Sequence, residues 1–97
     1  MERLTIKDID LVQTCGACPE QYEAYHNEKQ VGYLRLRHGC FRVDYPDVGG
    51  EQILYTEHVH GDGCFEDYER EFYLNEAKQA IVNRLALPID GKEVEGE

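Results

Sequence analysis

Cysteine and histidine are the side chains in this chain best suited to hold a metal ion. Cys15 and Cys18 form a Cys-x-x-Cys pair, and two thiolates at this spacing can grip one tetrahedral Zn²⁺. The motif also occurs in thiol–disulfide exchange, but Pro19 follows at once and the next pattern is that of a strand, not of a helix. Structural cysteines, the favoured interpretation, a zinc site at Cys15 and Cys18, and a redox pair therefore all stay open. Further zinc ligands could come from Cys40, His58, His60 or Cys64.

The residues that nucleophilic catalysis needs do not form a recognisable set. The chain contains no serine, so a nucleophile would have to be cysteine or threonine, and neither type stands in an activating context. Glu57 and His58 are adjacent in sequence, which says nothing about their geometry. We therefore expect a protein that is not an enzyme.

A basic cluster accompanies one tyrosine in the middle of the chain. Arg35 and Arg37 alternate with apolar residues, so they share a strand face with Tyr33, and Arg42 follows on the next predicted strand. Guanidinium groups beside an aromatic ring can bind a phosphate or a nucleotide. The commoner alternative is that these arginines pair with carboxylates on neighbouring strands.

Acidic residues are concentrated between positions 44 and 76. This stretch holds ten acids and one base, so it carries −9 of the formal net charge of −10. Such a field repels nucleic acid and anionic membranes and attracts basic protein surfaces. Carboxylates on a rigid scaffold can also imitate the phosphates of a duplex, although a solvated surface is the plain alternative. The predicted partner-binding residues are Asp44, Asp47, Glu51, Glu57, Asp62, Glu66, Asp67, Glu69 and Glu71.

The length and hydropathy of the chain predict one small domain. A chain of 97 residues suits a single domain with a modest core. We expect that domain to span residues 1–88, followed by a charged, disordered tail over 89–97. The sequence shows neither a membrane span nor the apolar core of a signal peptide, so a cytoplasmic protein is expected, in which cysteines are thiols or metal ligands before disulfides.

The elements that must position these residues follow from the hydrophobic periodicity. Alternation of period two predicts antiparallel strands at 21–26, 31–37, 40–45 and 52–59, with a possible additional strand within 4–12. Spacing of three and four predicts an amphipathic helix over 68–85 with Asp67 as its N-cap and Phe72 among its apolar positions. The predicted fold is α+β, a four-stranded antiparallel meander whose apolar face is covered by one C-terminal helix.

Three segments resemble a group of known proteins. They are Cys15-Gly-Ala-Cys-Pro-Glu-Gln-Tyr22, Val31-Gly-Tyr-Leu-Arg-Leu-Arg-His-Gly39 and the loop Asp44-Tyr-Pro-Asp47 with Gly49-Gly50. From about residue 14 to residue 85 the chain resembles small uncharacterised proteins encoded in phages and prophages of Gram-positive bacteria. The resemblance implies a setting in which small acidic proteins block host defence, including nucleic-acid mimics that inhibit CRISPR nucleases.

Three hypotheses follow for the function. The first is a non-enzymatic inhibitor that presents an acidic face to a basic host protein, one that itself binds nucleic acid. The second is a small-ligand or nucleotide binder that uses the face with Tyr33, Arg35, Arg37 and Arg42, a face that would also suit a homodimer. The third is a zinc-stabilised structural module.

Overall fold

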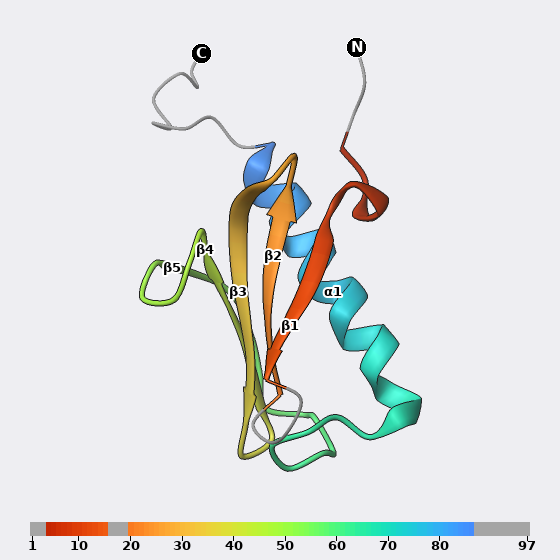
Figure 1. Ribbon diagram of the computed structural model, residues 1–97. Coiled ribbons are helices and arrows are strands. Elements are labelled where there is room, and N and C mark those ends of the chain that lie inside the picture. The colour runs from red at the N-terminus through yellow and green to blue at the C-terminus, as the bar shows by residue number, and fades with distance from the viewer. Residues whose placement is uncertain (1–3, 16–19, 87–97) are drawn as a thin grey trace, which may run out of the picture.

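Five consecutive strands form an antiparallel meander in the computed structural model, which describes residues 4–15 and 20–86. Figure 1 shows the sheet with one long helix against one of its faces. The strands are β1 (Asp10–Cys15), β2 (Gln21–His26), β3 (Lys29–Arg37), β4 (Cys40–Tyr45) and β5 (Glu51–Thr56). A short 3₁₀ helix, η1 (Ile6–Asp8), precedes the sheet, and the helix α1 (Asp67–Leu85) follows it.

The observed elements confirm the predicted α+β class and refine its details. The sheet has five strands instead of four within the described residues, because the additional N-terminal strand is formed, at Asp10–Cys15 instead of within 4–12. The last strand ends at Thr56, three residues earlier than predicted. The predicted tail, residues 89–97, lies outside the described residues. No helix within 4–15 and 20–86 is long and apolar enough to cross a membrane.

The core lies between α1 and the face of the sheet that the alternating apolar residues form. Leu34 and Leu36 on β3 and Phe41 and Val43 on β4 are buried, and Ile81 of α1 is buried against them. Gly32 permits this close approach, since a Cβ there would lie 2.7 Å from Cδ1 of Ile81. The opposite face of the sheet is left uncovered by any described element (Figure 1). We call it the open sheet face.

The prediction that Phe72 belongs to the buried side of the helix is wrong. Phe72 is 59% exposed, and Tyr73 turns inward in its place, stacking on Phe65 with ring centroids 5.5 Å apart. Tyr73 is four residues before the buried Ala77 and eight before the buried Ile81, so it shares their side of the helix. The apolar stripe thus runs through Tyr73 and leaves Phe72 at the surface.

The turn between β2 and β3 provides a first prediction. Asn27 and Glu28 have φ values of 54° and 69°, and a glutamate in this left-handed region costs about 1 kcal/mol that glycine would not. The Glu28→Gly variant should therefore unfold at a higher urea concentration. Lys29→Gly is the control, because it places glycine in a strand and should destabilise. A lower midpoint for Glu28→Gly would contradict this description of the turn.

Candidate functional site

Five of the nine predicted partner-binding carboxylates lie together where β5 leads into α1. They belong to the segment from the end of β5 to the second turn of the helix, and all five residues are exposed. They are Glu57, Asp62, Glu66, Asp67 and Glu71, and we call this group the acidic end. One arginine of this segment, Arg70, is held by Glu20 and Asp67, so it does not cancel the remaining charge.

The other four candidates do not belong to that group, so the nine do not form one continuous surface. Asp47 and Glu51 lie at the β4–β5 loop, and Glu51 pairs with Arg84 in the last turn of α1, 2.9 Å away. A helix of 19 residues is about 28 Å long, which separates this pair from the acidic end (Figure 1). Asp44 and Glu69 are only 4% and 6% exposed, so both carboxylates are structural. Sequence alternation could not reveal this, because burial here depends on tertiary partners.

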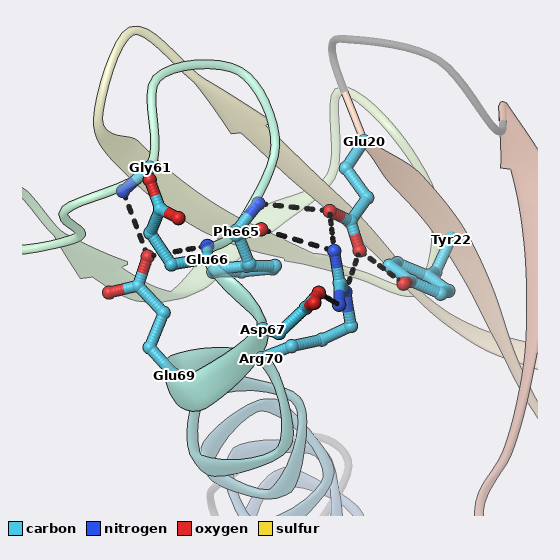
Figure 2. A network of polar contacts seen from close by, with 8 residues as sticks. All are labelled: Glu20, Tyr22, Gly61, Phe65, Glu66, Asp67, Glu69 and Arg70. Carbon is cyan, nitrogen blue, oxygen red and sulfur yellow. Dashed lines mark hydrogen bonds and ion pairs between the residues drawn. The ribbon is translucent and has the colours of Figure 1, made fainter.

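A buried ion pair fixes the acidic end to the sheet (Figure 2). Glu20 is 3% exposed, and its carboxylate accepts hydrogen bonds from Nε of Arg70 at 2.8 Å, from the Phe65 N–H at 2.9 Å and from the Tyr22 hydroxyl. Arg70 also donates to Oδ1 of Asp67 at 2.7 Å and to the Phe65 carbonyl at 3.1 Å. The first turn of α1, the preceding loop and β2 are thereby joined through one carboxylate.

A second buried carboxylate holds the loop that leads into the helix. Oε1 of Glu69 accepts from the His60 N–H at 3.0 Å, and Oε2 accepts from the N–H groups of Gly61 at 2.8 Å and Glu66 at 3.0 Å. The last of these bonds is half of the capping box that Glu66, not the predicted Asp67, begins. Only glycine fits at position 61, because the Cβ of any other residue would lie 1.8 Å from the Cys64 carbonyl oxygen. The loop between β5 and α1 is therefore held in place by hydrogen bonds from its own backbone to Glu69.

These two carboxylates predict a loss of stability in acid. Burial raises the pKa of Glu20 and of Glu69, but the hydrogen bonds from Arg70, Tyr22 and Phe65 to Glu20, and from three backbone N–H groups to Glu69, outweigh it and lower both pKa values below 4.5. Since the folded pKa lies below the unfolded one, each contributes stability above the unfolded pKa that disappears as the pH falls through the folded pKa.

The measurement compares wild type with Glu69→Gln, whose side chain cannot ionise. The advantage of wild type in the urea midpoint should be full at about pH 7 and should shrink towards about pH 3. An advantage that is the same at both pH values would contradict the ionised state of Glu69 in the folded protein.

Two exposed aromatic side chains stand within the acidic end. Tyr68 is 73% exposed and Phe72 is 59% exposed, and residues four apart share one side of a helix. The Tyr68 hydroxyl lies 2.7 Å from Nδ1 of His60, and the edge of the Phe72 ring meets the Tyr73 ring with centroids 5.0 Å apart. We call Tyr68 and Phe72 the aromatic pair. Glu71, three residues after Tyr68 on α1, is exposed as well.

The predicted basic cluster lies on the open sheet face, as its alternation indicated. Arg35 and Arg42 are direct cross-strand neighbours on β3 and β4, and Tyr33 donates from its hydroxyl to Oε1 of Gln21 at 2.7 Å. Arg42 pairs through Nε with Oδ1 of Asp44 at 2.7 Å, so an arginine of the cluster does pair with a carboxylate, but with one on its own strand β4 and not on a neighbouring strand. Neither side chain, that of Arg35 or that of Arg37, makes a hydrogen bond or an ion pair with any residue of 4–15 and 20–86.

The metal hypothesis gains no geometry from the described part of the chain. Within 4–15 and 20–86 no group of three or more histidine, cysteine or acidic side chains is arranged to hold a metal ion. Cys18 and the side chain of Cys15 lie outside the described residues, so zinc binding there stays a prediction. Cys64 takes part in a disulfide, which corrects the expectation of a thiol or metal ligand at this position, while Cys40 is a free thiol. Disulfide formation depends on tertiary contacts that sequence spacing does not reveal.

The sequence contained weak signals for the residues that prediction missed. Glu20 directly precedes a strand and no neighbour in sequence suggests its burial, since its cation is Arg70, fifty positions away. The aromatic pair could have been found by noting that Tyr68 and Phe72 are four residues apart among acids. The adjacent Tyr73 concealed it, because either aromatic could have faced the core.

No protein-family model, curated protein or solved structure matches this chain. The function is therefore inferred from the chain's own surface and chemistry.

Proposed function

We propose that this protein is a non-enzymatic binding protein whose acidic end and aromatic pair together receive an arginine- or lysine-rich surface of another protein. The observation that carries this proposal is the position of Tyr68 and Phe72, which are highly exposed and stand in a segment with five exposed carboxylates, of which only Asp67 pairs with an arginine of the described residues. Tyrosine and phenylalanine are enriched in the centres of protein interfaces. Their exposure here is in keeping with a contact surface.

The combination of groups selects a basic partner over an apolar one. An arginine or lysine side chain can stack on an aromatic ring through a cation–π interaction while its charge pairs with a carboxylate. Glu71 is exposed and lies three residues after Tyr68 on the helix, and residues three apart are neighbours on a helix surface, so one basic side chain could reach both the ring and the carboxylate. A purely apolar partner would leave the carboxylates without counterions and would be disfavoured.

The partner class that fits best is a protein that binds nucleic acid. Its basic surface is complementary to phosphates, and carboxylates held in fixed positions can occupy the same surface. The Glu20–Arg70 and Glu69 contacts support this role, because they hold the acidic end in one conformation and reduce the entropy lost on binding. The resemblance to phage-encoded proteins favours a host defence protein, such as a CRISPR nuclease, as the target.

The test uses tagged protein to capture a partner from host lysate, followed by binding measurements with the purified partner. The acidic variant is Glu57→Gln, Asp62→Asn and Glu71→Gln. Its matched control, Asp10→Asn, Glu28→Gln and Glu51→Gln, removes the same charge from exposed positions away from the acidic end. The Tyr68→Ser, Phe72→Ser double variant removes the aromatic pair.

The proposal predicts distinct behaviour for the three variants. The acidic variant should raise the Kd by about tenfold at low salt and by less at high salt, because salt already screens the three carboxylates of the wild type that the variant lacks. The aromatic variant should raise it by about tenfold at every salt concentration. Equal losses of affinity for the acidic variant and its control would show that binding depends on net charge and not on the position of these carboxylates. Undiminished binding by the aromatic variant would contradict the proposed surface.

A further inference from the structure

The open sheet face carries a second arrangement that the acidic end does not use. Four residues form a row across four neighbouring strands, because register pairs Gln21 with Arg35, Arg35 with Arg42, and Arg42 with Tyr55. Residues directly opposite on antiparallel strands project to the same face of the sheet. The helix covers the other face (Figure 1), so this row faces outward.

The centre of the row holds two like charges side by side. Arg35 and Arg42 are cross-strand neighbours, and facing cations of this kind destabilise a sheet unless an anion lies between them. Asp44 binds Arg42 through Nε alone, which leaves the two terminal nitrogens of that guanidinium available. The Arg35 side chain has neither a hydrogen bond nor an ion pair with any residue of 4–15 and 20–86. The pair therefore has donors to spare and an electrostatic reason to bind an anion.

The neighbours of the arginines indicate what the anion is attached to. Tyr55 lies next to Arg42 on β5 and is 46% exposed, and strands are about 4.8 Å apart. The Tyr55 hydroxyl donates to Oε2 of Glu57 at 3.2 Å, so the part of this side chain that a ligand can use is the ring. A flat ring stacked on Tyr55 would thus lie one strand away from a phosphate held by both guanidiniums.

We propose that the open sheet face binds a phosphate ester that bears a planar ring, with the chemistry of a nucleoside monophosphate. Arg35 and the terminal nitrogens of Arg42 donate to the phosphate oxygens, since guanidinium forks match phosphate geometry. Tyr55 stacks on the base. Arg37, one position along the same face, supplies a further cation at the edge of the site.

The charge of the protein favours a small phosphate ester over a second copy of the chain as the ligand of this face. The acidic end of another copy would also bring carboxylates, but the overall charge of −10 makes two copies repel each other. A small dianion bears far less charge and can enter between the two arginines. The same repulsion disfavours a long nucleic acid strand over a mononucleotide.

The experiment titrates the full chain with adenosine monophosphate, inorganic phosphate and adenosine in separate calorimetric arms. The monophosphate should bind most tightly, phosphate more weakly and adenosine weakest, because only the first engages both the arginines and Tyr55. Arg35→Met should raise the Kd for the monophosphate by about tenfold or more, because one charge-assisted contact is lost. Tyr55→Ala should reduce monophosphate binding and leave phosphate binding unchanged.

Lys29→Met is the matched control, because it removes one exposed positive charge from the far end of β3. It should bind the monophosphate like wild type, and a loss equal to that of Arg35→Met would show attraction by general charge and overturn the site. Failure of all three compounds to bind would overturn it as well. If phosphate does not bind but the protein dimerises with concentration, and Arg35→Met abolishes the dimer, the face binds a second copy of the chain and the proposed ligand site is wrong. These outcomes are read separately from those at the acidic end, where only Glu57→Gln touches this face, through the hydrogen bond from the Tyr55 hydroxyl to Glu57.

Discussion

Replacing Arg70 with methionine is expected to lower the free energy of unfolding by about 3 kcal/mol, which a shift of the urea midpoint followed by circular dichroism would measure. The substitution leaves Glu20 as a buried carboxylate with hydrogen bonds but without its cation. An unpaired buried charge costs 3–5 kcal/mol at full burial. We take the lower figure because the Arg70 side chain is 34% exposed and water can reach the site.

Two companion variants separate the buried charge from other causes. Adding Glu20→Gln to Arg70→Met removes the stranded charge, so the double variant should be more stable than Arg70→Met alone. Asp67 is the exposed partner of Arg70, with 98% of its own side chain exposed. The Asp67→Asn variant should therefore change stability little. If the double variant is no more stable than Arg70→Met, the loss comes from the packing of the Arg70 side chain and not from the unpaired charge of Glu20.

Replacing Glu69 with alanine is expected to cost a similar amount, about 3 kcal/mol, by leaving backbone donors without their acceptor. The carboxylate accepts from the N–H groups of His60, Gly61 and Glu66. The bond from Gly61 is buried, so water cannot replace it without rearrangement. The loop before α1 should loosen, and amide hydrogen exchange over residues 60–66 should accelerate more than exchange in β3.

Glu71→Ala is the matched control for that substitution. Glu71 lies two residues further along the same helix, carries the same charge and is exposed, so its loss should leave stability and exchange nearly unchanged. Comparable effects for the two variants would show that net charge at the helix N-terminus matters here, and not the specific contacts of Glu69.

Local pattern was sufficient for most of the fold. The alternation of Leu34 and Leu36 with Tyr33 and Arg35 predicted both the strand and its two faces, and the structure has them as expected. The boundaries were less well determined: β1 begins later than predicted because residues 6–8 form a 3₁₀ helix with its own capping box. That box needs only Thr5 and Asp8, which are three residues apart.

The candidate site could be predicted only in part, and the reason is physical. An acid in the sequence can be a surface charge or a buried acceptor, and only its tertiary partners decide which. Asp44 is buried beside Arg42, and Glu69 is buried beneath a loop, whereas Asp62 and Glu66 stay exposed. The sequence thus located the excess of acids but could not divide them into two buried carboxylates, a pair at the β4–β5 loop and the exposed acidic end.

This division has a consequence for the proposed function. Charge reversal at Glu69 would damage the fold and the binding surface together, so a loss of binding by such a variant would be uninformative. Variants at Glu57, Asp62 and Glu71 avoid this problem, because their side chains are exposed and outside the buried contacts. The same reasoning favours Arg35 over Arg42 on the open sheet face, since Arg42 holds the buried Asp44.

The most direct test of the proposed function is amide hydrogen exchange of the purified complex with the captured partner, compared with the free protein. The proposed surface predicts slower exchange on binding within residues 57–76, strongest around Tyr68 and Phe72, and no change at the β4–β5 loop. Protection confined to the β4–β5 loop or to β3 and β4, with residues 57–76 unaffected, would contradict it.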